Sequence, residues 1–506
     1  MIFSYEMKRN PLPKSFIFLI PVILAFLLFG PQESVMAQGV LYWNQSLNAE
    51  ASLLSGAVVA GESGIAAIHY NPATIPEMTQ SNLSLSANLF SVYKYNAKNA
   101  LGSDFPANRT QGDVQPRILT LTLNPRKLPG LTMEVAYFCR SDDYNQVNQG
   151  TSLTTDIVQA NPGNEYYTAD FYYRSKFQDY NGGVGMGYKV SDAFAVGFSA
   201  MISYKDDQYY SLITASAFSD PDDGGQYLAE SMYNLKFNMY DVRLITKLGI
   251  HWRRQSWAFG ANMNLPSMKI FGDGTVVKQY SFANIHKVAG DPETSSTYYG
   301  GRQKKCTSHF KDPLSIAAGI NYYTLSGNAI FLFTAEYFFG MPQFDYIEAN
   351  HEPGEDGYDF TPGEPETWLS FKAKQKPVFN VGIAYKQRIS GELMFSGGFR
   401  TDFNSTDRLQ EGFLSYNEKT FYTFDLYHVN FGLGYGFKRG SIILGMQFSH
   451  GRADDKRQIV NLTEPVEYIS DSQLPLTGYL NNNVRIRYYD LMVYFGFVFK
   501  FLKDKE

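Results

Sequence analysis

The sequence predicts an all-β fold, a 14-stranded antiparallel transmembrane β-barrel plugged by an N-terminal segment. Three observations favour this class. Apolar and polar residues alternate along many segments, short and long connections alternate between these segments, and an apolar segment without alternation precedes the first. The composition agrees, because 16% of the residues are aromatic and 18% are charged while the mean hydropathy is only −0.26. These values exclude a disordered chain, and the net charge of −5 gives no basic surface for nucleic acid.

Residues 1–37 have the features of a secretory signal peptide. Basic residues precede an apolar run over 16–30, and Val35-Met36-Ala37 supplies a small-residue cleavage site. The apolar run is shorter than the roughly 20 residues that a membrane-spanning helix needs, so an uncleaved anchor helix is the weaker alternative. We therefore expect a protein that is exported to the bacterial outer membrane.

The alternation is clearest near the C-terminus. Every second residue from 489 to 501 is apolar, and the residues between them are mixed. This pattern is typical of a strand with lipid on one face and a polar lumen on the other. The same pattern recurs at 131–138, 379–386 and 429–438. A soluble sandwich also alternates, but it does not need so many aromatic residues on its apolar face.

Connections of two kinds separate the alternating segments, as in outer-membrane barrels. Short turns are predicted at 124–128, 191–192, 254–255, 326–327, 388–390 and 439–440, and long polar loops near 94–114, 141–167, 206–231, 272–304, 343–367, 404–418 and 452–481. The predicted strands are 81–93, 115–124, 130–140, 168–190, 193–205, 232–253, 256–271, 308–324, 327–342, 368–387, 390–403, 419–438, 440–451 and 482–501. An even number of strands places both ends of the barrel, 81–506, on the periplasmic side. Several strands are longer than a membrane requires and should project outward.

Residues 38–80 precede the first predicted strand and are rich in Ala, Gly and Ser. We expect this segment to fold as a plug inside the barrel. The lumen-facing residues beside the short turns are small, so the backbone of the plug can approach the wall closely. The alternative is that these small residues only relieve the curvature of the sheet. On one strand Ile330 and Leu332 depart from the pattern. The small residues are Gly185, Gly187, Ala258, Gly260, Ala317, Gly319, Gly382, Ala384, Gly434, Gly436 and Gly445.

A motif within the predicted plug is the most specific signal in the chain. The plug carries the glycines Gly56, Gly61 and Gly64, followed by the triplet Asn71, Pro72 and Ala73. At this position the sequence resembles the N-terminal hatch of the FadL/TodX family of outer-membrane transporters for long-chain fatty acids and aromatic hydrocarbons. The resemblance implies a fourteen-stranded barrel with a hatch, which agrees with the strand count above.

The resemblance also implies a passive mechanism. An apolar groove among the outer loops catches the ligand, which passes to a pocket against the hatch and leaves sideways into the membrane. Leu41, Tyr42 and Trp43 are the candidate pocket residues, and packing within the hatch is their alternative role.

In the family, a kink in the third strand opens the lateral exit. Here the candidate kink is Arg140, Ser141 and Asp142, where the alternation is interrupted, and the alternative is that the strand ends there. The expected partners are a hydrophobic small molecule, outer-membrane lipid and lipopolysaccharide, and the protein is expected to be a monomer.

Other chemistry finds little support in the sequence. There is no G-x-S-x-G, Walker A or zinc motif, and the seven histidines lack metal-ligand spacing, so we expect neither an enzyme nor a metal or cofactor. Cys139 and Cys306 are predicted to be unrelated thiols, although a bridge is conceivable. No residue can be assigned to a ligand carboxylate, so fatty acid and neutral hydrocarbon both stay open. A secretion-associated barrel of the same superfamily, which binds protein partners, and a general porin are the alternative functions.

Overall fold

The computed structural model describes most of the chain beyond the predicted signal peptide, which lies outside the described residues together with 38–40 of the predicted plug. In the described part, no helix is long and apolar enough to cross a membrane. The described residues are 41–43, 46–78, 82–125, 127–158, 160, 163–219, 227–288, 292–352, 357–407, 422–438 and 440–500.

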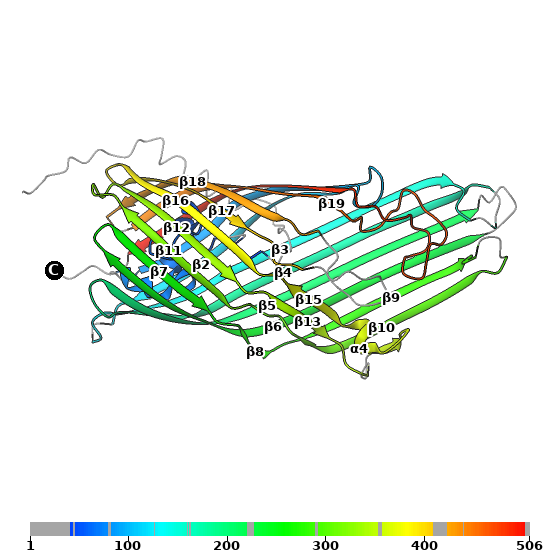
Figure 1. Cartoon of the computed structure of the whole chain (residues 1–506), viewed down its shortest axis with the longest axis horizontal. Helices are drawn as coiled ribbons and strands as arrows, with labels where there is room; N and C mark the ends of the chain where they lie inside the picture. The colour runs from blue at the N-terminus through cyan, green and yellow to red at the C-terminus, as the bar shows by residue number, and fades with distance from the viewer. Residues whose placement is uncertain are drawn as a thin grey trace, which may run out of the picture. The chain divides into compact units, whose positions relative to one another are not determined.

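Antiparallel strands dominate the structure (Figure 1). The helical elements are short: α2 (Ala49–Leu53), η1 (Gly64–Ala66), α3 (Ala67–Tyr70), η2 (Pro72–Glu77) and α4 (Pro365–Leu369). The strands are β1 (Asn82–Lys98), β2 (Ala107–Leu123), β3 (Leu131–Thr155), β4 (Glu165–Lys189), β5 (Phe194–Ser219), β6 (Leu228–Arg254), β7 (Trp257–Asn264), β8 (Met268–Phe271), β9 (Asp273–Ile285), β10 (Ser295–Ser308), β11 (Ser315–Tyr323), β12 (Ala329–Phe338), β13 (Met341–Glu348), β14 (Tyr358–Phe360), β15 (Phe371–Gln375), β16 (Val378–Ser390), β17 (Leu393–Asp402), β18 (Asp425–Phe437), β19 (Gly440–Lys456) and β20 (Val484–Lys500).

The strand pairing forms a continuous wall. Each strand from β1 to β7 pairs with the next, β7 pairs with β11, β11 with β12, and β12 with β16. The pairing continues in chain order from β16 to β20, and β20 pairs with β1. Within the described residues the succession of pairings thus returns to its first strand. The wall is extended beyond β7, β11 and β12 by six further strands, β8, β9, β10, β13, β14 and β15. The predicted all-β antiparallel class is confirmed.

Several of the long polar loops predicted from the sequence are in fact strand. β3 to β6 run through most of 141–167 and 206–231, and β9 and β10 occupy much of 272–304. Figure 1 shows these strands extending far beyond β7 and β11. The alternation persists there, but most of the buried inward side chains are apolar and most of the outward ones are polar, which is the reverse of the pattern in the membrane. A search for an apolar outward face therefore misses these strands.

The apolar outward face is seen in the part of the wall next to the short turns. On β20, Tyr489 and Leu491 are exposed while Asp490, Met492 and Tyr494 are buried, as the alternation predicts. Exposed large apolar side chains recur on the neighbouring strands, for example Leu433 on β18 and Leu444 on β19. Such a band is the surface that a barrel presents to lipid.

A row of aromatic side chains marks the outer limit of this band on β3 to β8. Tyr137 lies 6.3 Å from Tyr180, and Tyr204 lies 6.5 Å from Tyr240, between ring centroids. Tyr180 is paired in register with Tyr204, and the Tyr240 ring lies 6.4 Å from that of Phe271. We call these five residues the aromatic row. Aromatic girdles of this kind stand at the membrane interface of outer-membrane barrels.

Residues 41–43 and 46–78, called here the N-terminal segment, lie against the inner side of the wall. α2 contacts β17, β18, β19 and β20, and η2 contacts β3, β4, β5 and β6. Ala51, Leu54, Ala57 and Ala60 are fully buried. Helices of one turn are not stable alone, so packing against the wall holds this segment in its conformation.

Inward-facing glycines allow the N-terminal segment to approach the wall closely. A Cβ atom added at Gly197 would lie 2.2 Å from the backbone of Pro72 and Ala73, and one added at Gly260 would lie 2.0 Å from the Val59 carbonyl oxygen. Not every predicted small residue has this role. A Cβ added at Gly434 would meet only side chains of the wall, at 3.7 Å or more.

This contrast supplies a first test. Gly197→Ala should push Pro72 and Ala73 off β5 and loosen the N-terminal segment, at a cost of about 1–3 kcal/mol typical of overpacking. We expect faster protease cleavage within 41–78 and a higher ion conductance in planar bilayers. Gly434→Ala is the matched control and should behave as wild type. Equal conductance and protease resistance of the two variants would contradict the proposed packing.

Candidate ligand pocket

Asn71 of the hatch motif joins the N-terminal segment to the wall. The side chain is fully buried; its amide nitrogen donates to the carbonyl oxygens of Val59 at 2.8 Å and Ile250 of β6 at 3.0 Å. Its amide oxygen accepts from the Ala73 backbone N–H at 3.0 Å and so caps η2, which begins with Pro72. An Asn N-cap followed by Pro is a favourable start for a helical turn.

The hatch glycines shape the turns between the short helices. Gly56, Gly61 and Gly64 have φ angles of +71°, +114° and +54°, which side chains other than glycine rarely adopt. A Cβ atom at Gly64 would also lie 2.4 Å from a carboxylate oxygen of Glu50. These glycines are therefore placed for backbone geometry, and they do not line a polar site themselves except for Gly56, which borders the pocket described next.

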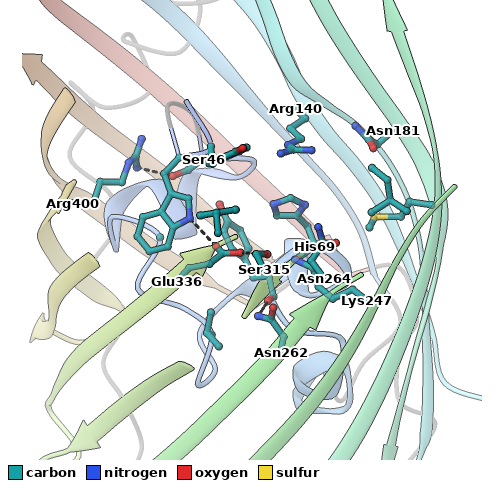
Figure 2. Close-up of a pocket in the computed structure, with 18 residues that line it drawn as sticks. Ser46, His69, Arg140, Asn181, Lys247, Asn262, Asn264, Ser315, Glu336 and Arg400 are labelled. Atoms are coloured by element: carbon teal, nitrogen blue, oxygen red, sulfur yellow. Dashed lines mark hydrogen bonds between the residues drawn. The ribbon is translucent and has the colours of Figure 1, made fainter. Parts of the chain in front are cut away.

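A cavity of about 70 Å³ lies between the N-terminal segment and the wall (Figure 2). This volume has room for several water molecules or a small polar group. Its lining combines apolar side chains with a large share of polar and charged ones. The lining residues are Tyr42, Trp43, Ser46, Gly56, Val59, His69, Tyr70, Arg140, Asn181, Met201, Ile245, Lys247, Asn262, Asn264, Ser315, Glu336, Phe338 and Arg400.

Two of the three candidate pocket residues line this cavity. The Tyr42 ring stacks on Phe338 with centroids 4.1 Å apart, and the Trp43 indole N–H donates to Glu336 at 2.8 Å. Leu41 lines a neighbouring cavity of about 30 Å³, which also has Tyr42 on its lining. Tyr42 therefore lies between the two cavities.

Charged side chains that the sequence did not single out give the pocket its character. The Lys247 ammonium donates to the carbonyl oxygen of His69 and forms no ion pair among the described residues. The Arg400 guanidinium donates to Ser46 Oγ and to Gln447 Oε1, both at 2.8 Å. Lys247 is 6% exposed and Arg400 is 1% exposed, so both cations are held away from bulk water.

His69 adds no charge to the pocket at neutral pH. Burial, together with the nearby Lys247 and Arg140 cations, holds the pKa of His69 well below its usual value. Its ring lies 5.1 Å from Tyr70 and 5.5 Å from Phe138. The cavity is thus lined by three cations, Arg140 among them, and by the carboxylate of Glu336, with His69 neutral.

Arg140, a candidate kink residue, stands at an irregularity of β3. The register between β3 and β4 shifts between Cys139 and Ser141. The Arg140 guanidinium extends into the lumen, where it lies 3.0 Å from Asp312 and 3.6 Å from Asp179. The predicted interruption is therefore a bulge within a strand that continues to Thr155.

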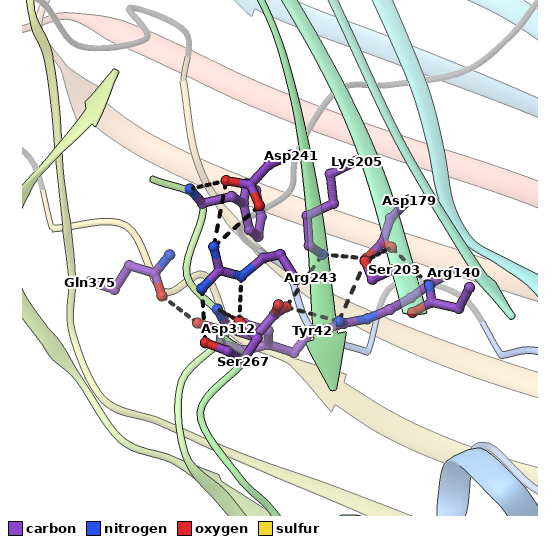
Figure 3. Close-up of polar contacts among 12 residues, drawn as sticks. Tyr42, Arg140, Asp179, Ser203, Lys205, Asp241, Arg243, Ser267, Asp312 and Gln375 are labelled. Carbon is purple, nitrogen blue, oxygen red and sulfur yellow. Dashed lines mark hydrogen bonds and ion pairs between the residues drawn. The ribbon is translucent and has the colours of Figure 1, made fainter. Parts of the chain in front are cut away.

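The two carboxylates belong to a larger buried network (Figure 3). The Lys205 ammonium lies 2.6 Å from Asp179 and 3.4 Å from Asp312. Ser267 Oγ accepts from Arg243 at 2.8 Å and from the Asp312 backbone N–H at 3.0 Å. The network ties β3, β4, β5 and β6 to the segment before β11, at the level of the small cavity.

Ser141 and Asp142 have local roles next to the bulge. Ser141 donates to Asp143, and Asp142 accepts from Gln178 at 3.0 Å and from Tyr180 at 3.3 Å. They do not line the larger cavity. The free thiols Cys139 and Cys306 are both buried, in agreement with the prediction of two separate cysteines.

Comparison with known proteins settles the fold. No protein-family model and no curated protein matches the chain. A solved structure of the toluene transporter TodX of Pseudomonas putida matches with a TM-score of 0.55 and 13% identity, over 90% of this chain and 99% of that one. A second TodX structure matches with a TM-score of 0.53 and 14% identity, over 93% and 100%. The chain has the TodX fold.

The TodX fold explains why the charged pocket residues were not found in the sequence. Lys247 on β6 and Arg400 on β17 are 153 positions apart, and both meet the N-terminal segment only because the wall curves around it. The available signal was weak. Each is one of several buried charges on its strand, which include Asp241 and Arg243 on β6 and Asp402 on β17.

Proposed function

We propose that the protein is a passive outer-membrane transporter for hydrophobic molecules that carry a carboxylate group. The TodX fold supports the transporter class, since the similar structures are described as those of a toluene transporter. The buried pocket, which is lined by cations, supports a carboxylate as the head group of the ligand. In this proposal 38–80 is the hatch, 81–506 is the barrel, and the protein works as a monomer surrounded by outer-membrane lipid and lipopolysaccharide.

The observation that most favours a carboxylate group on the ligand is the position of the Lys247 ammonium. An ammonium taken out of water is costly unless it is paired with an anion. Lys247 donates to a carbonyl oxygen, and although the Glu336 carboxylate lines the same cavity, the two form no ion pair in the described part of the chain. Arg400 lines the same cavity. A carboxylate placed in the cavity would accept charge-assisted hydrogen bonds from both cations.

The apolar part of the ligand has a separate environment. The parts of β3 to β6, β9 and β10 that extend beyond β7 and β11 are called here the projecting strands. They enclose a buried apolar cluster that includes Phe171, Tyr209 and Phe237. Phe177 and Phe310 belong to this cluster and also line the small cavity beside Tyr42. We propose that the ligand moves from this cluster past Tyr42 and Arg140 to the pocket, and leaves into the membrane beside the bulge of β3.

Apolar ligands need no energy source for this route. The bilayer is the low-energy destination for an alkyl chain, at about 0.8 kcal/mol per buried CH₂ group. The Arg140–Asp312 ion pair and the Tyr42–Phe338 stack close the path in the present conformation. We propose that hatch and bulge move together when ligand passes, because Arg140 contacts both the pocket and the network.

Lipids that purify with the native protein test this function. Mass spectrometry of an extract from protein prepared in mild detergent should detect a long-chain carboxylic acid at near-stoichiometric amounts. An empty pocket, together with normal oleate uptake in a deletion strain, would overturn the transporter function. A co-purifying protein docked at the outer loops with no acyl ligand would instead favour the secretion-associated barrel.

A further inference from the structure

The outward face of the projecting strands carries a row of cationic and aromatic side chains. In register, Arg174 of β4 pairs with Tyr210 of β5, and Tyr210 pairs with Lys236 of β6. Lys236 pairs with Val277 of β9, and Val277 pairs with Arg302 of β10. Residues directly opposite one another share a face of the sheet, so these five side chains form one continuous row.

This row lies within a hollow of about 940 Å³ on the outside of the wall. Of the residues that line the hollow, three are basic and one, Asp170, is acidic, although the whole chain has a net charge of −5. The rings of Tyr172 and Tyr210 lie 5.3 Å apart within it. The other lining residues are Asn148, Leu212, Thr214, Asn234, Asn238 and Thr275.

The three cations of the row differ from other basic residues on this face in their pairing. Nearer the membrane, Lys176 forms an ion pair with Asp206 at 3.7 Å. Among the described residues, no such ion pair involves Arg174, Lys236 or Arg302. Neighbouring strands are about 4.8 Å apart, so successive cations on alternate strands are separated by about 10 Å. A ligand with several phosphate groups can contact all three at once.

The position of the row relative to the membrane indicates which ligand this is. Arg174 precedes Tyr180 of the aromatic row by six residues on β4, and Lys236 precedes Tyr240 by four residues on β6. At about 3.3 Å per residue and a tilt near 45°, the cations lie roughly 10–14 Å above the apolar band. This is the level of the headgroups of the outer leaflet, above the acyl chains.

We propose that this hollow binds the phosphorylated inner-core sugars of lipopolysaccharide in the surrounding outer leaflet. The three cations would pair with core phosphates, and the tyrosine rings would pack on sugar faces. Asn148 and Asn234 supply amide groups for sugar hydroxyls. The site is distinct from the transport pocket and faces away from it. The proposal rests on the outer-membrane location in the proposed function and goes beyond transport.

Binding of lipopolysaccharide to the full chain in detergent, followed by native mass spectrometry, tests the site. The probes are purified lipopolysaccharide with a phosphorylated inner core and the same material after dephosphorylation. We expect the triple variant Arg174→Gln, Lys236→Gln, Arg302→Gln to bind the phosphorylated form at least about tenfold more weakly than wild type. Wild type should bind the dephosphorylated form as weakly as the triple variant does.

The matched control removes three exposed basic residues near the opposite end of the strands: Arg254→Gln, Arg388→Gln, Lys438→Gln. This variant should bind like wild type. Equal affinity of wild type and the Arg174 triple variant, or affinity unchanged by dephosphorylation, would overturn the proposal. Displacement of the phosphorylated lipopolysaccharide by inorganic phosphate at equal concentration would also overturn the proposal, because it would identify the hollow as a site for free phosphate. Lys247→Met should bind lipopolysaccharide as wild type does. Failure of the proposed lipopolysaccharide site can therefore be distinguished from failure of the proposed transport function.

Discussion

Replacing Lys247 by methionine is expected to weaken oleate binding at least about tenfold while changing the affinity for oleyl alcohol less than about twofold. The two ligands differ in the charge of the head group. A hydrogen bond to a charged group contributes about 1.5–3 kcal/mol, and about 1.4 kcal/mol corresponds to a tenfold change in the dissociation constant. Methionine keeps the length and volume of the side chain. Titration of each ligand into purified protein in detergent measures the difference.

Two further variants sharpen this result. Arg400→Met should also lower the affinity for oleate more than that for oleyl alcohol, because its guanidinium lines the same cavity. Lys438→Met, which removes an exposed cation outside the pocket, should bind both ligands as wild type does. Parallel losses for acid and alcohol in Lys247→Met would mean that the residue shapes the pocket without recognising a carboxylate.

Replacing Lys386 by methionine is expected to release the N-terminal segment from the wall. The Lys386 ammonium on β16 lies 2.7 Å from Glu62 and 3.1 Å from Glu50, both in the N-terminal segment. Burial by itself raises the pKa of Glu62, but the Lys386 ammonium outweighs it and holds that pKa below its usual value. Loss of the cation leaves two partly buried carboxylates facing each other, at a cost of about 2–3 kcal/mol.

The readouts are ion conductance in planar bilayers and protease cleavage within the N-terminal segment. Both should rise in Lys386→Met and return toward wild type in the triple variant Lys386→Met, Glu62→Gln, Glu50→Gln, in which the opposing charges are gone. Heat-modified migration on gels should show that the barrel itself still folds. A Lys386→Met protein with wild-type conductance and protease resistance would mean that the ion pairs do not hold the N-terminal segment in place.

Alternation was sufficient to predict the membrane part of the wall. Leu491 and Asp490 take opposite faces of β20 as expected, since each side chain must suit either lipid or the lumen. The rule does not extend above the membrane. On β5 and β6 the inward Tyr209 and Phe237 are the apolar residues, and the outward positions are polar because they face water or headgroups. Residues 206–231, which include Tyr209, were therefore predicted as a loop, whereas Phe237 lies within the predicted strand 232–253.

The candidate site was only partly predictable. The hatch motif is local, so Asn71 and its neighbours could be identified from a short stretch of sequence. Tyr42 and Trp43 were found for the same reason. Lys247, Arg400 and Glu336 become a site only where distant strands meet the N-terminal segment, and no local pattern distinguishes them from other inward charges.

The most direct test of the carboxylate transporter is uptake by a deletion strain that carries the wild-type protein. Radiolabelled oleate and toluene are supplied separately, and the same strain with Lys247→Met is compared. We predict that wild type restores oleate uptake well above that of toluene, and that Lys247→Met loses most of the oleate uptake. Equal restoration of toluene uptake by wild type, or full oleate uptake with Lys247→Met, would contradict the assignment of the pocket to a carboxylate.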